Sequence, residues 1–346
     1  MYQAYFNNKF TNSLVYYVSL LLLLLISPFL FIWELITTLR SCFHPIENMS
    51  GKVVLITGAS SGLGELMAYE YAKRGACLAI VAIKEPDSRL EKVAERAREL
   101  GSPDVLFIFA DVSKVDECRM FVDDTIKRFG RLDHLVCNAG IANLYSVNID
   151  ITKFAPVMNI CHVPCKKHNH SKQLLSWVIY EHMQDINFWG SLYTTHFAMP
   201  HVMRSSGKIV VNASCAGILN PPKGGFYNTS KAALISFYES LRFEVSPRVT
   251  IVILTLGFIE TNIITAKYLG KGVGVALRKD FNSLLPTMGA EPCAIAIVDG
   301  VCKGATSITE PRFVKVLFLV KFLFPELHQF YLSKFYRSKS KKNKKG

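Results

Sequence analysis

Short apolar runs alternate with amphipathic stretches along most of this chain, and that alternation limits its fold more than any other feature. A parallel sheet whose strands are each followed by a helix produces this pattern. The runs expected as strands are Val53–Thr57, Cys77–Ala82, Val105–Phe109, Leu132–Val136, Lys208–Val211 and Thr250–Leu254. The stretches expected as helices include Gly62–Arg74, Ser88–Leu100, Val115–Arg128 and Phe226–Val245. The sequence therefore predicts an α/β fold with one Rossmann-type, doubly wound parallel sheet, whose ligand lies beyond the carboxyl ends of the strands.

A glycine-rich loop, Thr57-Gly58-Ala59-Ser60-Ser61-Gly62-Leu63-Gly64, follows the first expected strand. Gly58 would permit a tight turn, and Gly62 would let the backbone approach a pyrophosphate. Gly64 would allow close packing of the next helix, whose N-terminus faces that anion. Three glycines alone could be a structural turn, but their place between a strand and a helix favours a dinucleotide site.

Tyr227 and Lys231 lie four residues apart at the start of a long helical pattern, and Ser214 stands 13 residues before the tyrosine. Positions i and i+4 share a helix face. A phenol needs its pKa lowered from about 10 to about 7, or ~4 kcal/mol, to act as a base near neutral pH. One ammonium at ~4 Å in an effective dielectric of ~20 supplies about that much. Such a pair alone is ordinary helix surface, but beside a glycine-rich loop it indicates proton transfer at a nucleotide site.

With these motifs, the sequence resembles the short-chain dehydrogenase/reductase family over about Lys52–Pro311. The further matching pieces are Ala110-Asp111-Val112, Asn138-Ala139-Gly140 and Asn187. Within the family, the segments Asp185–Gly190 and Thr309–Pro311 and the apolar N-terminus look most like plant hydroxysteroid dehydrogenases of the 11-beta type, the steroleosins of oil bodies.

This resemblance implies catalytic roles for four residues. Tyr227 would exchange a proton with the substrate carbonyl or alcohol, and Lys231 would lower the pKa of Tyr227 and hold the nicotinamide ribose. Ser214 would orient the substrate oxygen, and Asn187 would hold a water in the proton path. The cofactor would supply the hydride.

The resemblance also implies a cofactor-binding set, in which Asp111 approaches the adenine and Asn138–Gly140 form a wall beside the nicotinamide. The full set is Gly58, Ser60, Ser61, Gly62, Leu63, Gly64, Lys84, Asp111, Val112, Asn138, Ala139, Gly140, Tyr227, Lys231 and Gly257. No resident metal is expected.

The end of the second expected strand, Ala82-Ile83-Lys84-Glu85, bears on the choice of cofactor. An acid at the strand tip binds the ribose 2′-OH of NAD, whereas a basic residue accepts the 2′-phosphate of NADP. No acid occupies Ala82 or Ile83, and Lys84 is available. The sequence therefore favours NADP, with NAD as the alternative.

The N-terminal segment from Leu14 to Trp33 contains no charged residue. At ~1.5 Å per residue its 20 residues would cover about 30 Å, the thickness of the bilayer hydrocarbon. Pro28 can kink this segment or turn it back, so a spanning helix and a hairpin anchor are both open. A cleaved signal peptide is a rival, although the stretch is longer than usual and lacks a small-residue cleavage site. We expect residues 1–45 to be a membrane anchor and the protein to be membrane-associated, at lipid droplets or the endoplasmic reticulum.

Residues 312–346 form an apolar and then basic C-terminal segment. Val314–Tyr336 could be an interfacial helix on lipid or a flap over a hydrophobic pocket, and Pro325 argues against one long helix. The last 13 residues hold seven of the cationic side chains behind the net charge of +13, and no acid. Such a tail suits anionic lipid or is simply solvated, and we expect no nucleic-acid partner.

The dinucleotide-binding catalytic domain is expected over 46–311. Within it, residues 159–184 are an insertion that interrupts the family pattern before Asn187. They are a functional loop, a small zinc site, or sequence translated from an unspliced intron or a wrongly joined gene. Cys161, Cys165, His168 and His170 are plausible zinc ligands, but ligands so crowded rarely enclose one tetrahedral ion.

These features together predict a membrane-associated oxidoreductase that transfers a hydride between NADP(H) and a hydroxyl or ketone of a lipophilic, steroid-like substrate. The resemblance places a substrate lid around Phe258–Leu285, where the apolar residues either suit a sterol or simply belong to the core. A homodimer is also open. The alternative is a catalytically impaired scaffold on a membrane or lipid-droplet surface that retains the fold.

Overall fold

The computed structural model describes residues 46–142, 183–222, 224–260 and 286–342, together with a few helical positions before residue 46. The chain divides into two units, Met1–Glu47 and Asn48–Gly346. Most of the expected anchor, of the interruption at 159–184 and of the expected lid lies outside the described residues, as do residues 343–346 of the basic tail.

In the first unit, the described positions of the expected anchor are helical and exposed, and most of their side chains are apolar. The large apolar ones are Val18, Leu21, Leu25, Ile26, Phe29, Ile32 and Ile36, and Ser27 and Pro28 lie among them. Across the residues that the structure describes, no helix combines the length and apolar character needed to span a membrane.

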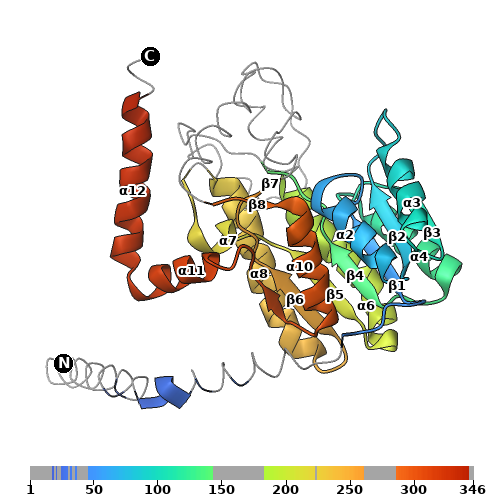
Figure 1. Cartoon of the computed structure of the whole chain (residues 1–346), viewed down its shortest axis with the longest axis horizontal. Coiled ribbons are helices and arrows are strands. Elements are labelled where there is room, and N and C mark those ends of the chain that lie inside the picture. Colours follow the sequence, from blue (N-terminus) through green and yellow to red (C-terminus); the bar gives the residue numbers. More distant parts are fainter. Residues whose placement is uncertain are drawn as a thin grey trace, which may run out of the picture. The chain divides into compact units, whose positions relative to one another are not determined.

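Among the described residues of the second unit, seven parallel strands form one sheet in the order β3-β2-β1-β4-β5-β6-β9 (Figure 1). The strands are β1 Val53–Thr57, β2 Cys77–Ala82, β3 Val105–Phe109, β4 His134–Cys137, β5 Lys208–Asn212, β6 Thr250–Leu254 and β9 Ser307–Ile308. The order reverses between β1 and β4. The carboxyl ends of these two strands therefore form the switch point at which a doubly wound sheet binds its ligand.

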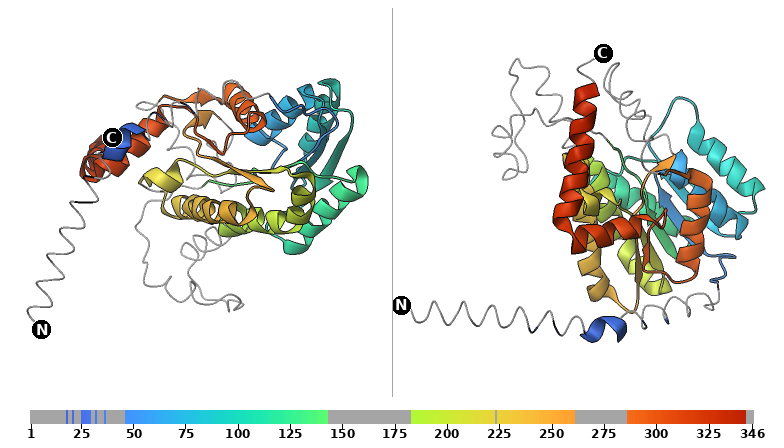
Figure 2. Two further views of the ribbon diagram at one scale, coloured as in Figure 1. Left: turned by 90° about the horizontal axis from the view of Figure 1, so that it is seen from below. Right: turned by 60° about the vertical axis from the view of Figure 1, so that its left-hand side comes forward.

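Helices cover both faces of this sheet, which Figure 2 shows edge-on in its left view. One layer holds α2 (Gly62–Lys73), α3 (Arg89–Glu99) and α10 (Ala290–Cys302). The other holds α4 (Val115–Phe129), α6 (Gly190–Ser205) and α8 (Gly225–Val245). Alternate residues of β1 enter the two cores, and all five of its residues are buried. Burial on both faces explains why the strands are continuous apolar runs.

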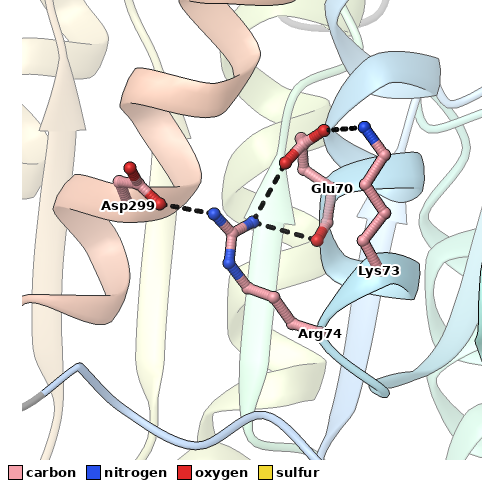
Figure 3. Close-up of polar contacts among 4 residues, drawn as sticks. All are labelled: Glu70, Lys73, Arg74 and Asp299. Carbon is pink, nitrogen blue, oxygen red and sulfur yellow. Dashed lines mark hydrogen bonds and ion pairs between the residues drawn. The ribbon is translucent and has the colours of Figure 1, made fainter.

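Helix α2 is fastened to α10 at the end opposite to the glycine-rich loop (Figure 3). The Arg74 guanidinium donates to the backbone oxygen of Glu70 (2.9 Å) and also contacts the carboxylates of Glu70 and Asp299. Lys73 Nζ lies 2.6 Å from the Glu70 carboxylate. These contacts fix the far end of the helix whose first turn follows the glycine-rich loop.

The α/β prediction with one doubly wound sheet is confirmed, and β1, β2, β3 and β6 have the predicted boundaries. Leu132–Val136 was predicted as the fourth strand, but β4 is shifted to His134–Cys137. The sequence pattern did not indicate β9, which has only two residues. The chain is helical from before Asp185 through α6, as expected for the segment that presents Asn187. Two further strands, β7 (Ile259–Glu260) and β8 (Met288–Gly289), pair with each other.

The C-terminal segment forms two helices, α11 (Val314–Leu323) and α12 (Pro325–Lys342). Phe324 lies between them with φ −133°, and Pro325 begins the second helix. The prediction that Pro325 excludes one long helix is therefore confirmed.

Candidate active site

The glycine-rich loop is packed backbone against backbone at the end of β1. Gly58 and Gly62 have φ of +65° and +64°, which other residues rarely adopt. A Cβ on Gly58 would lie 2.7 Å from the Cα of Ala139, and one on Gly64 would lie 2.2 Å from the oxygen of Gly58. Any side chain at Gly58 or Gly64 would therefore displace the loop.

Helix α2 starts at Gly62, directly after this loop. Its N-cap residue, Ser61, makes no side-chain capping hydrogen bond with any described residue. The first N–H groups of a helix have no acceptor within the helix and bind anions well. Ser60 and Leu63 are buried beside them. The glycine-rich loop and the first turn of α2 together form a cradle that fits the pyrophosphate of a dinucleotide.

Asn138 ties the loop to the ends of β4 and β5. Its Nδ2 donates to the oxygens of Thr57 and Gly58, at 3.1 Å each. Its Oδ1 accepts a hydrogen bond from Asn212 Nδ2 (2.9 Å). The N–H groups of Asn138 and Ala139 both donate to Thr57 Oγ1, again at 3.1 Å. The side chain expected beside the nicotinamide thus also braces three strand ends.

Lys231 on α8 is buried, with 4 % of its surface exposed. Its Nζ donates to the backbone oxygen of Asn212 (2.7 Å) and lies 5.8 Å from the centre of the Tyr227 ring. Burial lowers the pKa of Lys231 to about 8. The side chain is therefore still mostly protonated at pH 7, but it releases its proton more readily than an ordinary lysine.

Tyr227 lies one turn earlier on α8 and is half-buried. Burial raises the pKa of its phenol to about 12, while a hydrogen bond from the Ser214 side chain acts in the opposite direction. From the sequence, Lys231 is expected to lower this pKa. In this structure the loss of hydration outweighs the hydrogen bond from Ser214, so the phenol keeps its proton at neutral pH.

Ser214 follows β5 and is held against the segment that follows β6. Its Oγ donates to the oxygen of Leu256 (3.4 Å) and accepts from the N–H of Ala216 (3.1 Å). Only 7 % of its surface is exposed. Ser214 and Tyr227, 13 residues apart in sequence, are thus brought together.

Asn187 lies in a π-helix, Asp185–Trp189, directly before α6. Its side chain accepts from the N–H of Ile141 (2.8 Å) and donates to the oxygen of Ile141 (2.9 Å) and to Ser230 Oγ (3.1 Å). Both amide hydrogens therefore have protein acceptors. The side chain braces the chain after Gly140 against α8, and π-helical turns often occur at functional sites.

The remaining predicted cofactor residues lie at other strand ends. Asp111, after β3, accepts from the N–H and hydroxyl of Ser113 (2.9 and 2.7 Å). Lys84, after β2, is exposed with its Nζ 5.9 Å from the centre of the Phe109 ring. Val112 packs against the start of α6, where a Cβ on Gly190 would lie 2.8 Å from it. These contacts leave the Lys84 ammonium accessible at the end of β2.

Gly257, after β6, contacts the C-terminal part of the domain. Its N–H donates to the oxygen of Glu310 (2.7 Å), and an added Cβ would lie 2.9 Å from Val314 Cγ2. Gly140 lies nearer the predicted catalytic residues, because an added Cβ there would lie 3.2 Å from Asn187 Oδ1 and 3.5 Å from Lys231 Nζ.

Three polar residues of this network were given no role from the sequence: Thr57, Asn212 and Ser230. Thr57 and Asn212 are polar residues that end apolar strands, a signal that could have indicated them. Ser230 lies between the two helix residues that were singled out, and its partner Asn187 is 43 residues away. No local pattern could have shown that contact. Among the described residues, no group of His, Cys, Asp and Glu side chains could hold a metal ion.

A family model described as short chain dehydrogenase matches residues 52–271. The chain therefore belongs to the short-chain dehydrogenase/reductase family, as the motifs indicated, and it is an oxidoreductase of that family.

Two similar proteins within the family are hydroxysteroid dehydrogenases or are named as like them. The chain is 47 % identical to 11-beta-hydroxysteroid dehydrogenase 1A of Arabidopsis thaliana, over 84 % of this chain and 77 % of that protein. It is 41 % identical to 11-beta-hydroxysteroid dehydrogenase-like 4A of the same plant, over 93 % of this chain and 96 % of the relative. A solved short-chain dehydrogenase/reductase from Burkholderia phymatum, in complex with NAD, shares the fold with a TM-score of 0.65 and 21 % identity, over 81 % of this chain and 96 % of that chain.

Proposed function

We propose that this protein transfers a hydride between NADP(H) and a hydroxyl or ketone of a lipophilic, steroid-like substrate at a membrane or lipid-droplet surface. The observation that carries the proposal is the pairing of Tyr227 with Ser214, one helical turn from the buried Lys231. Lys231 is hydrogen-bonded to the strand end that also braces the glycine-rich loop. Proton-transfer groups and a dinucleotide cradle thus share one network.

In the direction of ketone reduction, Tyr227 is the proton donor. With a pKa of about 12 its phenol is protonated at neutral pH, so it can give its proton to the substrate oxygen. Ser214 positions that oxygen with a second hydrogen bond, donated once its single hydroxyl hydrogen leaves the long bond to the Leu256 oxygen (3.4 Å). A nicotinamide cofactor held by the glycine-rich loop and Lys231 would supply the hydride. Lys231 then returns a proton to the phenolate, a step suited to its pKa of about 8.

Lys84 supports a preference for NADP. The ammonium is exposed at the end of β2, where the ribose 2′ position of a bound dinucleotide is expected. Its neighbour Glu85 is paired with Arg89 across 3.6 Å, which keeps that carboxylate engaged. A cation at this place suits a 2′-phosphate.

The steroid-like substrate is supported by the names of the two Arabidopsis relatives. Association with lipid is supported by the apolar residues 14–33, whose described side chains are exposed. Each Leu, Ile, Val or Phe favours the hydrocarbon by roughly 0.3 to 0.6 kcal/mol, so fourteen of them dominate over the basic tail.

The proposal is tested with the full chain in lipid vesicles, using corticosterone, an 11β-hydroxysteroid, with NADP⁺ or NAD⁺. We expect reduction of the cofactor, faster with NADP⁺, and flotation with the vesicles that is lost when residues 1–40 are removed. Removal of residues 332–346 should mainly reduce the salt sensitivity of binding. NADPH binding without turnover of corticosterone, or of its 11-ketone with NADPH, would instead favour the non-catalytic scaffold.

A further inference from the structure

Helix α7 (Ala216–Leu219) is a single turn that joins Ser214 to the catalytic helix α8. The N–H of Gly217 donates to the oxygen of Ser214 (3.1 Å). A Cβ on Gly217 would lie 2.8 Å from the nitrogen of Ala232 and 2.8 Å from the carbonyl carbon of Lys231. The backbone of α7 thus rests directly on the turn of α8 that carries Lys231. Its position sets where Ser214 stands relative to Tyr227.

The other end of α7 contacts the C-terminal helix α11. Lys321 Nζ donates a hydrogen bond to the backbone oxygen of Ile218, 103 positions away. Ile218 lies in the last turn of a helix, where carbonyl oxygens have no partner within the helix. Lys321 is partly buried, so this charged hydrogen bond is shielded from water.

Helix α11 also reaches Ser214 from its own first residue. Val314 is the one buried residue of α11, all of which the structure describes. It packs against Gly257, and the preceding Leu256 oxygen accepts from Ser214 Oγ (3.4 Å) and from the N–H of Cys215 (2.9 Å). The two ends of α11 therefore contact the two segments that hold Ser214.

We propose that Lys321 is a positioning residue. By holding the end of α7, it keeps the Ser214 side chain in place beside Tyr227. This inference rests on the proposed roles of Ser214 and Tyr227. It assigns to the C-terminal helix a part in the reaction, although α11 supplies none of the reacting groups.

The first test needs no substrate and measures hydrogen exchange of the full chain by mass spectrometry. In Lys321→Met, the amides of Ala216–Asn220 should exchange roughly tenfold faster than in the parent protein, because a charged hydrogen bond to this turn is lost. The peptides of β1 and β4 should be unchanged, which shows that the domain is folded. Lys321→Arg should retain most of the protection. Lys315→Met removes an exposed charge from the same helix and is the matched control.

The second test is kinetic, with corticosterone and NADP⁺. Lys321→Met should lower kcat about three- to tenfold with little change in the KM for NADP⁺, and Lys321→Arg should restore it. In a Ser214→Ala background, Lys321→Met should cause no further loss, because the residue it positions is absent.

Unchanged exchange at Ala216–Asn220 in Lys321→Met would overturn the inference, whatever the activity. So would an equal loss of kcat in the Ser214→Ala background, which would show that Lys321 acts elsewhere. Full activity of Ser214→Ala alone would remove the proposed role of Ser214 itself. That result would be seen without any change at Lys321, so the two failures are distinguishable.

Discussion

Replacing Lys231 by Met should stabilise the folded protein while destroying its activity. Burial lowers the pKa of Lys231 from the ordinary 10.5 to about 8. At pH 7 this difference means that the protonated side chain disfavours folding by about 3 kcal/mol. Methionine has a similar length and no charge, so it removes that cost. It also removes the hydrogen bond to the Asn212 oxygen, which is worth roughly 1 to 2 kcal/mol.

The net expectation at pH 7, without cofactor, is that Lys231→Met unfolds with a free energy about 1 to 2 kcal/mol higher than the parent. The stability advantage of Lys231→Met over the parent should decrease as the pH rises. Since the pKa is lower in the folded chain, the unfolded chain binds more protons between about pH 8 and 10.5, and the stability of the parent rises with pH there. The burial cost falls to about 1 kcal/mol at pH 10, so the advantage of Met should vanish or reverse.

Urea unfolding followed by circular dichroism at pH 7 and pH 10 measures both differences, and a substitution of the exposed Lys92 to Met is the control. Contributions from other titrating groups cancel between parent and variant. If Lys231→Met were less stable than the parent at pH 7, or if the difference did not change with pH, the buried ammonium would not be a destabilising group. Lys231 would then not be a group that releases a proton near neutral pH.

Three further predictions follow from the cradle, the strand ends and the interruption of the family pattern. Gly64→Ala should abolish NADPH binding measured by fluorescence, because its Cβ would lie 2.2 Å from the Gly58 oxygen. Gly225→Ala is the control and should bind NADPH normally, since no described atom lies within 4 Å of the added Cβ. Lys84→Ala should raise the KM for NADP⁺ about tenfold and leave that for NAD⁺ nearly unchanged, while a similar loss with both cofactors would contradict a contact with the 2′-phosphate. Deletion of residues 159–184 should raise kcat with little change in NADPH affinity, since misplacing Asn187 by about 1 Å can cost ~100-fold in rate; equal or lower activity would make the segment a functional element.

The strands of this fold could be predicted from the sequence because a parallel sheet covered on both faces leaves uninterrupted apolar runs. Val53–Thr57 is buried at every position, and the sequence predicts both ends of this strand correctly. Ser307–Ile308 was not found, because two residues carry no period.

The candidate site was less predictable, because its geometry depends on contacts between distant segments. The glycine-rich loop and the Tyr227 turn are local motifs, whereas the bond from Lys231 to Asn212 and the clamp of Asn187 on Ile141 and Ser230 join separate elements. The pKa of Tyr227 shows the same limit. A sequence estimate can include the charge of Lys231, but it cannot include the burial that here raises the phenol's pKa to about 12.

The central claim is that Tyr227 transfers the proton at a dinucleotide site built by the rest of the network. It is tested most directly by comparing the parent with Tyr227→Phe, using corticosterone oxidation for turnover and NADPH fluorescence for binding. Phenylalanine keeps the ring and removes only the exchangeable proton. The account predicts turnover at least 100-fold lower with NADPH affinity nearly unchanged, consistent with a general acid–base contribution of ~10²–10⁴. Retention of most of the oxidoreductase rate by Tyr227→Phe would contradict it.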